Sequence, residues 1–230
     1  SNEIFDYQTY KNIIFQNKLS IDNSYNEYYF NNDQSLNHQS FKSTAIISSD
    51  LQFSKMGITT PKIKFIIPTQ IENNNKSINE DSESITFNYQ SQFSDNRFFG
   101  SDLFDSSPRM VYGIENYYNT KNTEISFNIN QSLDANLNNN YAYLVNQNSR
   151  LSDYSIESKL KINEILFKID TRLDNDNLSK KEMNYELSYN KFLNTSVIYN
   201  ETQSEAYKNL STDTQSIIMN ISKKINDNVN

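Results

Sequence analysis

The stretch SIESKLKINEILFKIDTRL, residues 155–173, alternates apolar and polar side chains with a period of two. The apolar positions are even in its first half and odd in its second: Ile156, Leu160, Ile162, then Ile165, Phe167, Ile169 and Leu173. Such alternation indicates two half-buried strands, and a two-residue turn at Asn163 and Glu164 requires this change of parity. Ile162 would then lie opposite Ile165. A four-residue turn, which would pair Glu157 with Lys168, fits the alternation equally well.

Two further hairpins are predicted by the same pattern. One joins the face of 183–189 to that of 193–199 through a three-residue turn at 190–192, which places Leu187 opposite Thr195. The other joins the face of Tyr112, Ile114 and Tyr118 to that of Phe127 and Ile129 through a turn of about four residues at 119–122. In the first hundred residues, strands are expected at 19–25, 45–53, 61–67 and 84–93. Pro61 and Pro68 bracket the third of these, in keeping with strand ends.

The connections between these strands alternate in length from residue 119 onward. Short turns near 119–122, 163–164 and 190–192 alternate with longer polar stretches at 133–152, 175–181 and 200–211. Outer-membrane barrels have short turns at one end and longer loops at the other, whereas a soluble sandwich has no reason to sort its loops this way. The sequence therefore predicts an antiparallel transmembrane β-barrel, all-β and partial, with roughly a dozen strands. Residues 1–230 are expected to form a single barrel segment.

The composition agrees with one apolar face and one wet face. Only 36% of residues are hydrophobic, yet the chain contains 16 Tyr and 14 Phe, too many aromatic residues for a disordered chain. A net charge of −7 argues against a nucleic-acid partner. The absence of cysteine excludes disulfides and thiolate metal sites. No apolar run approaches the ~20 residues of a transmembrane helix.

No residue pattern predicts a catalytic, cofactor-binding or metal site, and the protein is therefore not expected to be an enzyme. The single histidine, His38, lies in a polar stretch and lacks the positioned partner that acid–base catalysis needs. The acidic segment 170–177 lacks the glycine and the distal glutamate of a calcium loop, which favours a solvated loop.

The stretch SDNRFFGSDLFDSSPRMVYGI, residues 94–114, gathers rare residues: two of the three glycines, two of the four arginines and one of the three prolines. Gly100 permits a left-handed backbone or a close approach. Arg97 can bridge carboxylates, and the nearby candidates are Asp95, Asp102 and Asp105. Pro108 then restarts a strand. These features favour a loop pinned to a barrel wall over direct contact with a ligand.

This region resembles the LPS-assembly outer-membrane protein family (LptD, also called OstA or Imp). An acidic-Ser segment, a motif of the type N-R-F-x-G-x-D and a strand x-Y-G-L follow one another in that family. The matching residues are Asp81, Ser82, Asn96, Arg97, Phe98, Gly100, Asp102, Tyr112, Gly113 and Ile114. Leu103 stands where the family usually has a second arginine, which weakens any ion pair there. Weaker likeness extends over about 61–224.

The resemblance implies a protein that receives lipopolysaccharide from a periplasmic LPS-bridge protein. It would insert the lipid into the outer leaflet of the cell outer membrane through a lateral opening. An outer-membrane lipoprotein plug (LptE-like) and membrane lipid would be its partners, and no cofactor would be needed. The chain would be an internal piece of a larger barrel, without the family's periplasmic jellyroll and closing strands. A diffusion porin, an autotransporter-type barrel and a surface-exposed β adhesin are the alternatives.

Overall fold

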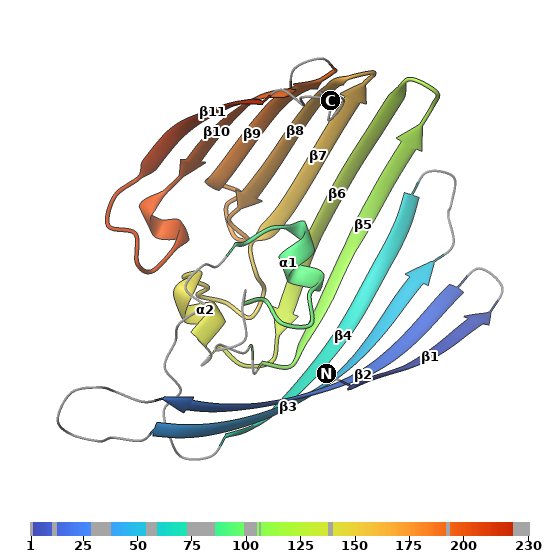
Figure 1. The fold of residues 1–230 in the computed structure, drawn as a ribbon, viewed down its shortest axis with the longest axis vertical. Coiled ribbons are helices and arrows are strands. Elements are labelled where there is room, and N and C mark those ends of the chain that lie inside the picture. The colour runs from blue at the N-terminus through green and yellow to red at the C-terminus, as the bar shows by residue number, and fades with distance from the viewer. Residues whose placement is uncertain are drawn as a thin grey trace, which may run out of the picture.

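The computed structural model describes residues 2–10, 13–28, 38–53, 59–72, 86–98, 105, 107–137, 140–191 and 194–222. Within them, one antiparallel sheet of 11 strands runs in chain order from β1 to β11 (Figure 1). The strands are β1 Asn2–Tyr10, β2 Ile13–Tyr28, β3 His38–Phe53, β4 Thr59–Glu72, β5 Arg109–Asn119, β6 Thr123–Asp134, β7 Tyr154–Ile162, β8 Ile165–Leu173, β9 Lys180–Asn190, β10 Asn194–Thr202 and β11 Thr214–Ser222. The all-β antiparallel prediction is confirmed.

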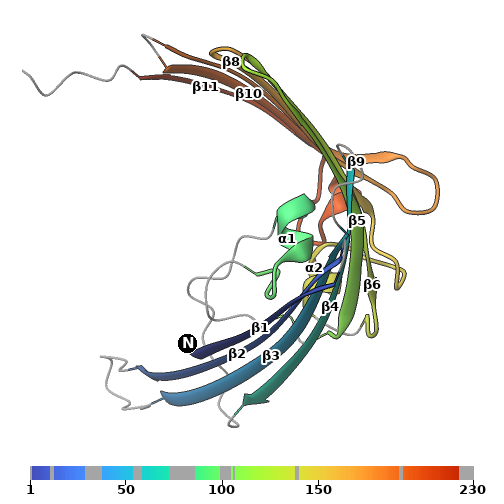
Figure 2. The ribbon, with the colours of Figure 1, turned by 90° about the vertical axis from the view of Figure 1, so that its right-hand side faces the viewer.

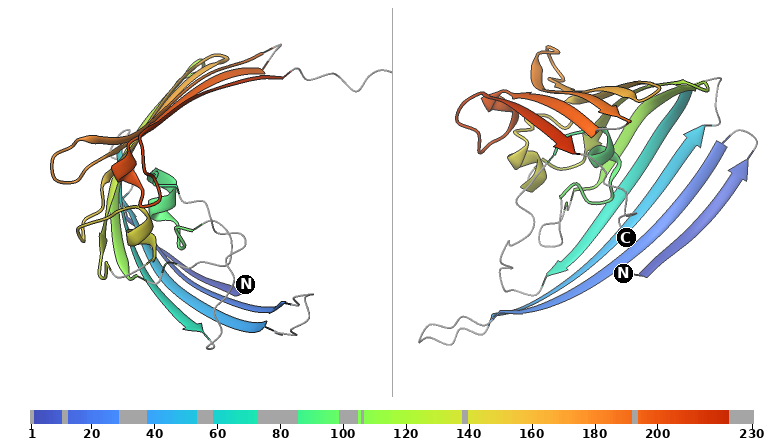
Figure 3. Two further views of the ribbon diagram at one scale, coloured as in Figure 1. Left: turned by 90° about the vertical axis from the view of Figure 1, so that its left-hand side faces the viewer. Right: turned by 45° about the horizontal axis from the view of Figure 1, so that its top comes forward.

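The sheet curves into an open trough. Its concave side encloses two short helices, α1 (Tyr89–Phe93) and α2 (Asn140–Leu144) (Figure 2). The first strand, dark blue, and the last, red, lie at opposite margins of the sheet (Figure 3). The architecture is that of a partial barrel. None of the helices in the described part of the chain is long or apolar enough to cross a membrane.

Between the described strands, short and long connections alternate from β1 to β11. The short ones are 11–12, 54–58, 120–122, 163–164 and 191–193, and the long ones are 29–37, 73–108, 135–153, 174–179 and 203–213. Because consecutive strands are antiparallel, all short connections lie at one end of the sheet and all long ones at the other. The alternation predicted from residue 119 therefore also holds in the first hundred residues.

The convex face carries a continuous row of mainly apolar side chains. Cross-strand pairing places the following residues side by side: Tyr118, Ile125, Leu160, Phe167, Leu187, Val197 and Met219. Most are conspicuously exposed, with Leu187 at 52% and Met219 at 71%. One residue along each strand, on the concave face, the adjacent row reads Ser126, Lys159, Lys168 and Glu186. The sheet thus has an apolar outside and a polar inside.

One predicted turn is confirmed, and a second differs from its prediction by one residue. Ile162 lies opposite Ile165 and Leu160 opposite Phe167, so the turn at Asn163 and Glu164 has two residues. The backbone of Asn163 supports this turn with a φ of 51°, a left-handed value that asparagine tolerates better than most residues. In the hairpin of β5 and β6 the predicted apolar residues share one face, but the connection is 120–122, one residue shorter than the predicted turn at 119–122. Ile114 therefore lies opposite Ile129, whereas the longer turn would have placed it opposite Phe127.

Three further predictions are wrong. Leu187 pairs with Val197 and not with Thr195, because the connection is 191–193 and begins one residue later than expected. Residues 84–93 do not form a strand: within the described part, 86–88 are irregular and 89–93 form α1. Pro61 and Pro68 lie inside β4 and do not bracket it. Pro68 lies beyond Ile66, where the ladder from β4 to β5 ends, so one side of the strand needs no donor there.

Candidate functional site

Three long connections fold back against the concave face and together form an inner plug, defined as 86–98, Asp105, 140–153 and 203–210. Its core consists of the side chains of Phe87, Phe98, Tyr141 and Val145, with Leu144 and Tyr207 packed against them. Phe98 meets Tyr141 edge-on, with ring centroids 5.8 Å apart. These residues come from segments far apart in sequence, so the plug is a tertiary structure and not a local loop motif.

The helix α1 begins at a capping box formed by Asn88 and Ser91, whose side chains accept hydrogen bonds from backbone N–H groups that have no acceptor within the helix. The Asn88 side chain accepts a hydrogen bond from the Ser91 backbone N–H at 2.8 Å, and the Ser91 hydroxyl accepts one from the Asn88 N–H at 3.0 Å. This reciprocal capping box satisfies two donors at the start of the helix. It overrides the alternating pattern that otherwise suggests a strand here.

Arg97 is the centre of the plug. Its Nε donates to Asp105 at 2.5 Å, and its Nη2 donates to Asp134 at the end of β6 at 2.6 Å. Its guanidinium lies 3.8 Å from the ring centroid of Tyr141. Arg109, at the start of β5, donates to the same Asp105 oxygen at 2.7 Å. Because Arg97 and both carboxylates are almost fully buried, this cluster ties the plug to the wall through desolvated, charge-assisted bonds.

Ionisation in the cluster follows from these contacts. Burial by itself raises the pKa of the Asp105 carboxyl, but the positive charges of Arg97 and Arg109 outweigh it and hold the pKa below its usual range. Burial opposes the charge on Arg97 as well, and the adjacent Asp105 and Asp134 carboxylates reverse that effect and raise its pKa. The arginine and Asp105 are therefore both charged at neutral pH.

A second buried arginine holds the other side of the plug. Arg172 on β8 donates to Asp153 at 2.7 Å, to the carbonyl of Ala206 at 2.8 Å and to that of Val145 at 2.6 Å. Its guanidinium also lies over the ring of Phe87, 4.3 Å from the centroid. One side chain of the wall thereby joins the three plug segments, which is a use of the planar, multivalent guanidinium that lysine cannot reproduce.

The plug also contacts β5 and β6 directly. The Asn130 amide donates to the Tyr89 carbonyl at 2.9 Å, and the Tyr89 hydroxyl donates to Glu115 at 2.9 Å. Gly113 on β5 lies directly opposite Asn130 on β6. A Cβ at Gly113 would approach the Ile129 carbonyl oxygen to 2.6 Å. The glycine therefore permits close packing of the wall beside the point where α1 docks.

The structure brings three of the predicted motif residues together. Arg97 and Phe98 lie in the plug core, and Asn96 supports them by accepting from the Asp105 and Phe98 backbone N–H groups at 3.1 and 3.3 Å. Gly113 lies in the wall, and Tyr112 points to the convex face, where its hydroxyl donates to Gln131. Asp81, Ser82, Gly100 and Asp102 lie outside the described residues.

Of the two carboxylates that bind Arg97, the sequence predicted only one. Asp105 was among the three candidate carboxylates, whereas Asp95 pairs with Lys18 at 3.1 Å and Lys64 at 2.8 Å. Asp134 was not anticipated. Segment 170–177 was expected to be a solvated loop, but its Arg172 is buried in β8. No local signal distinguishes Asp134 or Arg172, because their partners come from distant segments.

The concave wall next to the plug carries many charged side chains. No group of three or more His, Asp or Glu side chains among them could hold a metal ion. The charged side chains of the concave wall are paired across strands: Lys62 with Glu115 at 2.6 Å, Lys159 with Glu124 at 2.5 Å and Lys168 with Glu157 at 3.3 Å. The result is a polar inner surface with largely paired charges, next to an anchored plug.

Comparison with known proteins identifies the family. The family model LptD, described as LPS transport system D, matches residues 23–229, which is most of the chain. A search of curated proteins found no match. With its open antiparallel sheet, apolar outside and polar inside, this chain belongs to the LPS transport system D family.

Proposed function

We propose that this chain forms part of the wall of an outer-membrane translocon that inserts lipopolysaccharide into the outer leaflet. The family acts in lipopolysaccharide transport; the translocon role of this chain is the proposal. Lipopolysaccharide is an amphiphile with an apolar acyl portion and a polar sugar portion. A wall that separates a wet lumen from lipid suits it, because each portion can remain in a medium that solvates it.

The observation that carries the proposal is the division between the two faces of the sheet. The convex row contains Ile125, Phe167 and Leu187, all exposed, while the adjacent concave row contains Lys159, Lys168 and Glu186. In an outer-membrane barrel the first face meets hydrocarbon and the second lines the lumen. No covalent bond needs to be made or broken, and the role is therefore transport and not catalysis.

The partners follow from the same role. The open sheet has two unpaired margins within the described residues, and in a bilayer further strands have to close it, since an open edge in lipid is unfavourable. An LptE-like lipoprotein plug would occupy the remaining lumen, and a periplasmic bridge protein would deliver the lipid. The site of action is the outer membrane, as in the family as a whole.

The test is reconstitution of the full-length protein that contains this chain, with its lipoprotein, in vesicles. Lipopolysaccharide supplied with its bridge protein on the lumenal side of the vesicles should become accessible to a sugar-modifying probe on the outside. A porin would release small solutes and leave lipopolysaccharide behind. Failure of lipopolysaccharide to appear outside, in vesicles whose protein is correctly folded, would refute the proposal.

A further inference from the structure

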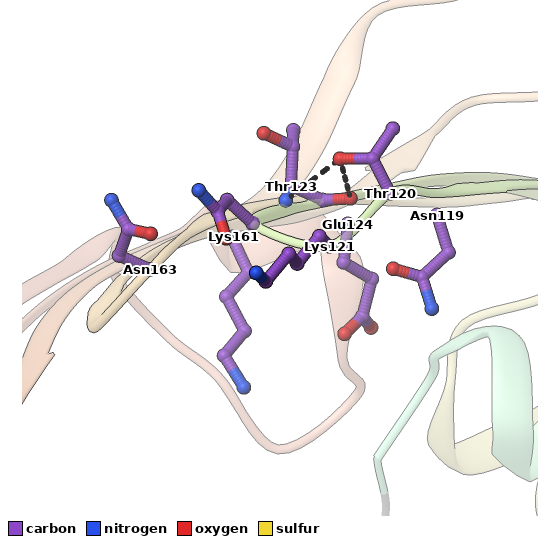
Figure 4. A pocket seen from close by; sticks show the side chains of 8 residues that line it. Asn119, Thr120, Lys121, Thr123, Glu124, Lys161 and Asn163 are labelled. Atoms are coloured by element: carbon purple, nitrogen blue, oxygen red, sulfur yellow. Dashed lines mark hydrogen bonds between the residues drawn. The ribbon is translucent and has the colours of Figure 1, made fainter.

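A polar hollow of about 220 Å³ lies at the end of the sheet that carries the short connections (Figure 4). It spans the turn between β5 and β6 and the neighbouring turn between β7 and β8. Its lining consists of Asn119, Thr120, Lys121, Asn122, Thr123, Glu124, Lys161 and Asn163. Amide, hydroxyl and ammonium groups predominate, so the hollow is rich in hydrogen-bond donors.

The hollow opens toward the concave side of the sheet. Lys161 lies directly opposite Glu124 in the ladder between β6 and β7. Glu124 occupies the same strand face as Asn130, which contacts the plug. Figure 4 shows the Glu124 and Lys161 side chains on the same side of the sheet ribbon. The residues that line the hollow, here called the rim, therefore face the lumen and not the lipid.

The charges of this rim do not cancel. Glu124 is bound by Lys159 at 2.5 Å, and Glu164 lies 3.5 Å from Lys191. Within the described part of the chain, Lys121 and Lys161 have no carboxylate in ion-pair range. Two uncompensated ammonium groups share one hollow in a protein whose net charge is −7. The net negative charge of the protein repels an anionic ligand. At the rim, the two ammonium groups make the local electrostatic potential more positive.

We propose that the rim of Lys121 and Lys161 is an anion subsite that receives the phosphate groups of lipopolysaccharide as the lipid enters the lumen. The inference rests on the proposed function, which brings that lipid to the periplasmic side, where the short turns of outer-membrane barrels lie. A phosphate monoester carries up to two charges and strong acceptor oxygens. Two ammonium groups with the amides of Asn119, Asn122 and Asn163 supply the complementary donors.

The experiment compares Lys121→Gln/Lys161→Gln with a control of equal charge change, Lys180→Gln/Lys191→Gln. Lys180 at the start of β9 is paired with Glu201, and Lys191 lies on another turn and is paired with Glu164. Full-length protein is titrated with lipopolysaccharide, with enzymatically dephosphorylated lipopolysaccharide, and with vesicles of phosphatidylglycerol. We expect the first variant to bind lipopolysaccharide about tenfold more weakly than wild type, the control to lie within about twofold, and the difference to vanish after dephosphorylation.

Each other result overturns the subsite. Unchanged affinity of Lys121→Gln/Lys161→Gln for lipopolysaccharide removes the role of the rim. An equal loss in the control shows a general charge effect. A loss seen only with phosphatidylglycerol assigns the rim to phospholipid headgroups. If wild type transports lipopolysaccharide while one of these results holds, the subsite alone fails; if wild type transports none, the proposed function fails.

Discussion

Arg97 acts at the scale of single residues by joining two carboxylates from different elements, Asp105 in the plug and Asp134 at the end of β6. The ring of Tyr141 covers its guanidinium, so the three charged groups interact at low local dielectric, where each unpaired member would cost several kcal/mol. The sequence predicts that Arg97 bridges carboxylates, because aspartates crowd around it. It cannot identify Asp134, which lies 37 residues away and is brought near only by the sheet.

Arg97→Lys should reduce the free energy of unfolding by about 3 kcal/mol, because one ammonium cannot serve both carboxylates and leaves a buried charge unpaired. Urea titration of the protein in lipid vesicles measures this. Arg150→Lys is the matched control, since Arg150 is exposed and its substitution should change stability by no more than about 0.5 kcal/mol. Equal midpoints for the two variants would contradict the role of Arg97.

Asp105 makes the attachment of the plug sensitive to acid. Its folded pKa is depressed below the unfolded value of about 3.9, so the stabilisation is complete above that value and is lost as pH falls through the lower, folded pKa. A nitroxide at the exposed Gln90 in α1 should stay immobile from pH 7 to about pH 4 and become mobile below it. Asp105→Asn should give the mobile spectrum already at pH 7; an immobile spectrum there would show that Asp134 alone holds Arg97.

At the scale of elements, local chemistry decides some registers and leaves others open. The change of parity around Asn163 and Glu164 fits a two-residue turn, and Asn163 tolerates the φ of 51° that this turn has. The connection between β9 and β10 carries no such signal. A shift of two residues keeps every side chain on its face, so pairing Leu187 with Thr195 or with Val197 satisfies the same pattern. The alternation of side chains in 84–93 predicts a strand, but the capping box of Asn88 and Ser91 starts the helix α1 there instead.

A cysteine pair tests the register of β9 and β10. Leu187→Cys/Val197→Cys should form a disulfide rapidly under mild oxidation, because directly opposite residues have Cβ atoms about 4.5–5.5 Å apart. Leu187→Cys/Thr195→Cys places the two sulfur atoms on a diagonal of about 7–8 Å and should react far more slowly. The chain has no native cysteine to compete. Mass spectrometry of the oxidised proteins distinguishes the pairs, and faster closure of the second pair would refute the register.

At the scale of the whole molecule, the sheet could be predicted from the sequence, whereas the plug on its concave side could not. Alternating side chains and alternating connection lengths are properties of neighbouring residues, and they indicate a barrel wall with an apolar outside. The plug depends on Arg97 and Arg172 reaching partners in segments far away along the chain. Its core residue Tyr141 lies in a stretch that looks merely polar in sequence, and Phe87 lies in one whose alternation predicts a strand. The curvature of the sheet brings these connections together.

The division between the faces gives a test on the intact barrel. Leu187 points to the convex side and is 52% exposed, while its neighbour Ser188 lies opposite Leu166 and Ser196 on the concave side. In a bilayer, Leu187→Lys should cost about 2–4 kcal/mol near the midplane, because it places a charge in hydrocarbon. Ser188→Lys should cost only about 0.5 kcal/mol or less, because the lumen is hydrated.

The lysine pair cannot by itself separate a lipid-facing surface from a protein core, since a charge is unfavourable in both. A nitroxide at position 187 separates them by what can reach it. Lipid contact makes the label accessible to dissolved oxygen and inaccessible to aqueous nickel complexes, and the same label at position 188 should show the reverse preference. Because side chains alternate across a strand, this inversion between adjacent residues is expected only where one face meets hydrocarbon and the other meets water. A label at 187 that neither reagent reaches would place Leu187 in a protein core and exclude the barrel wall.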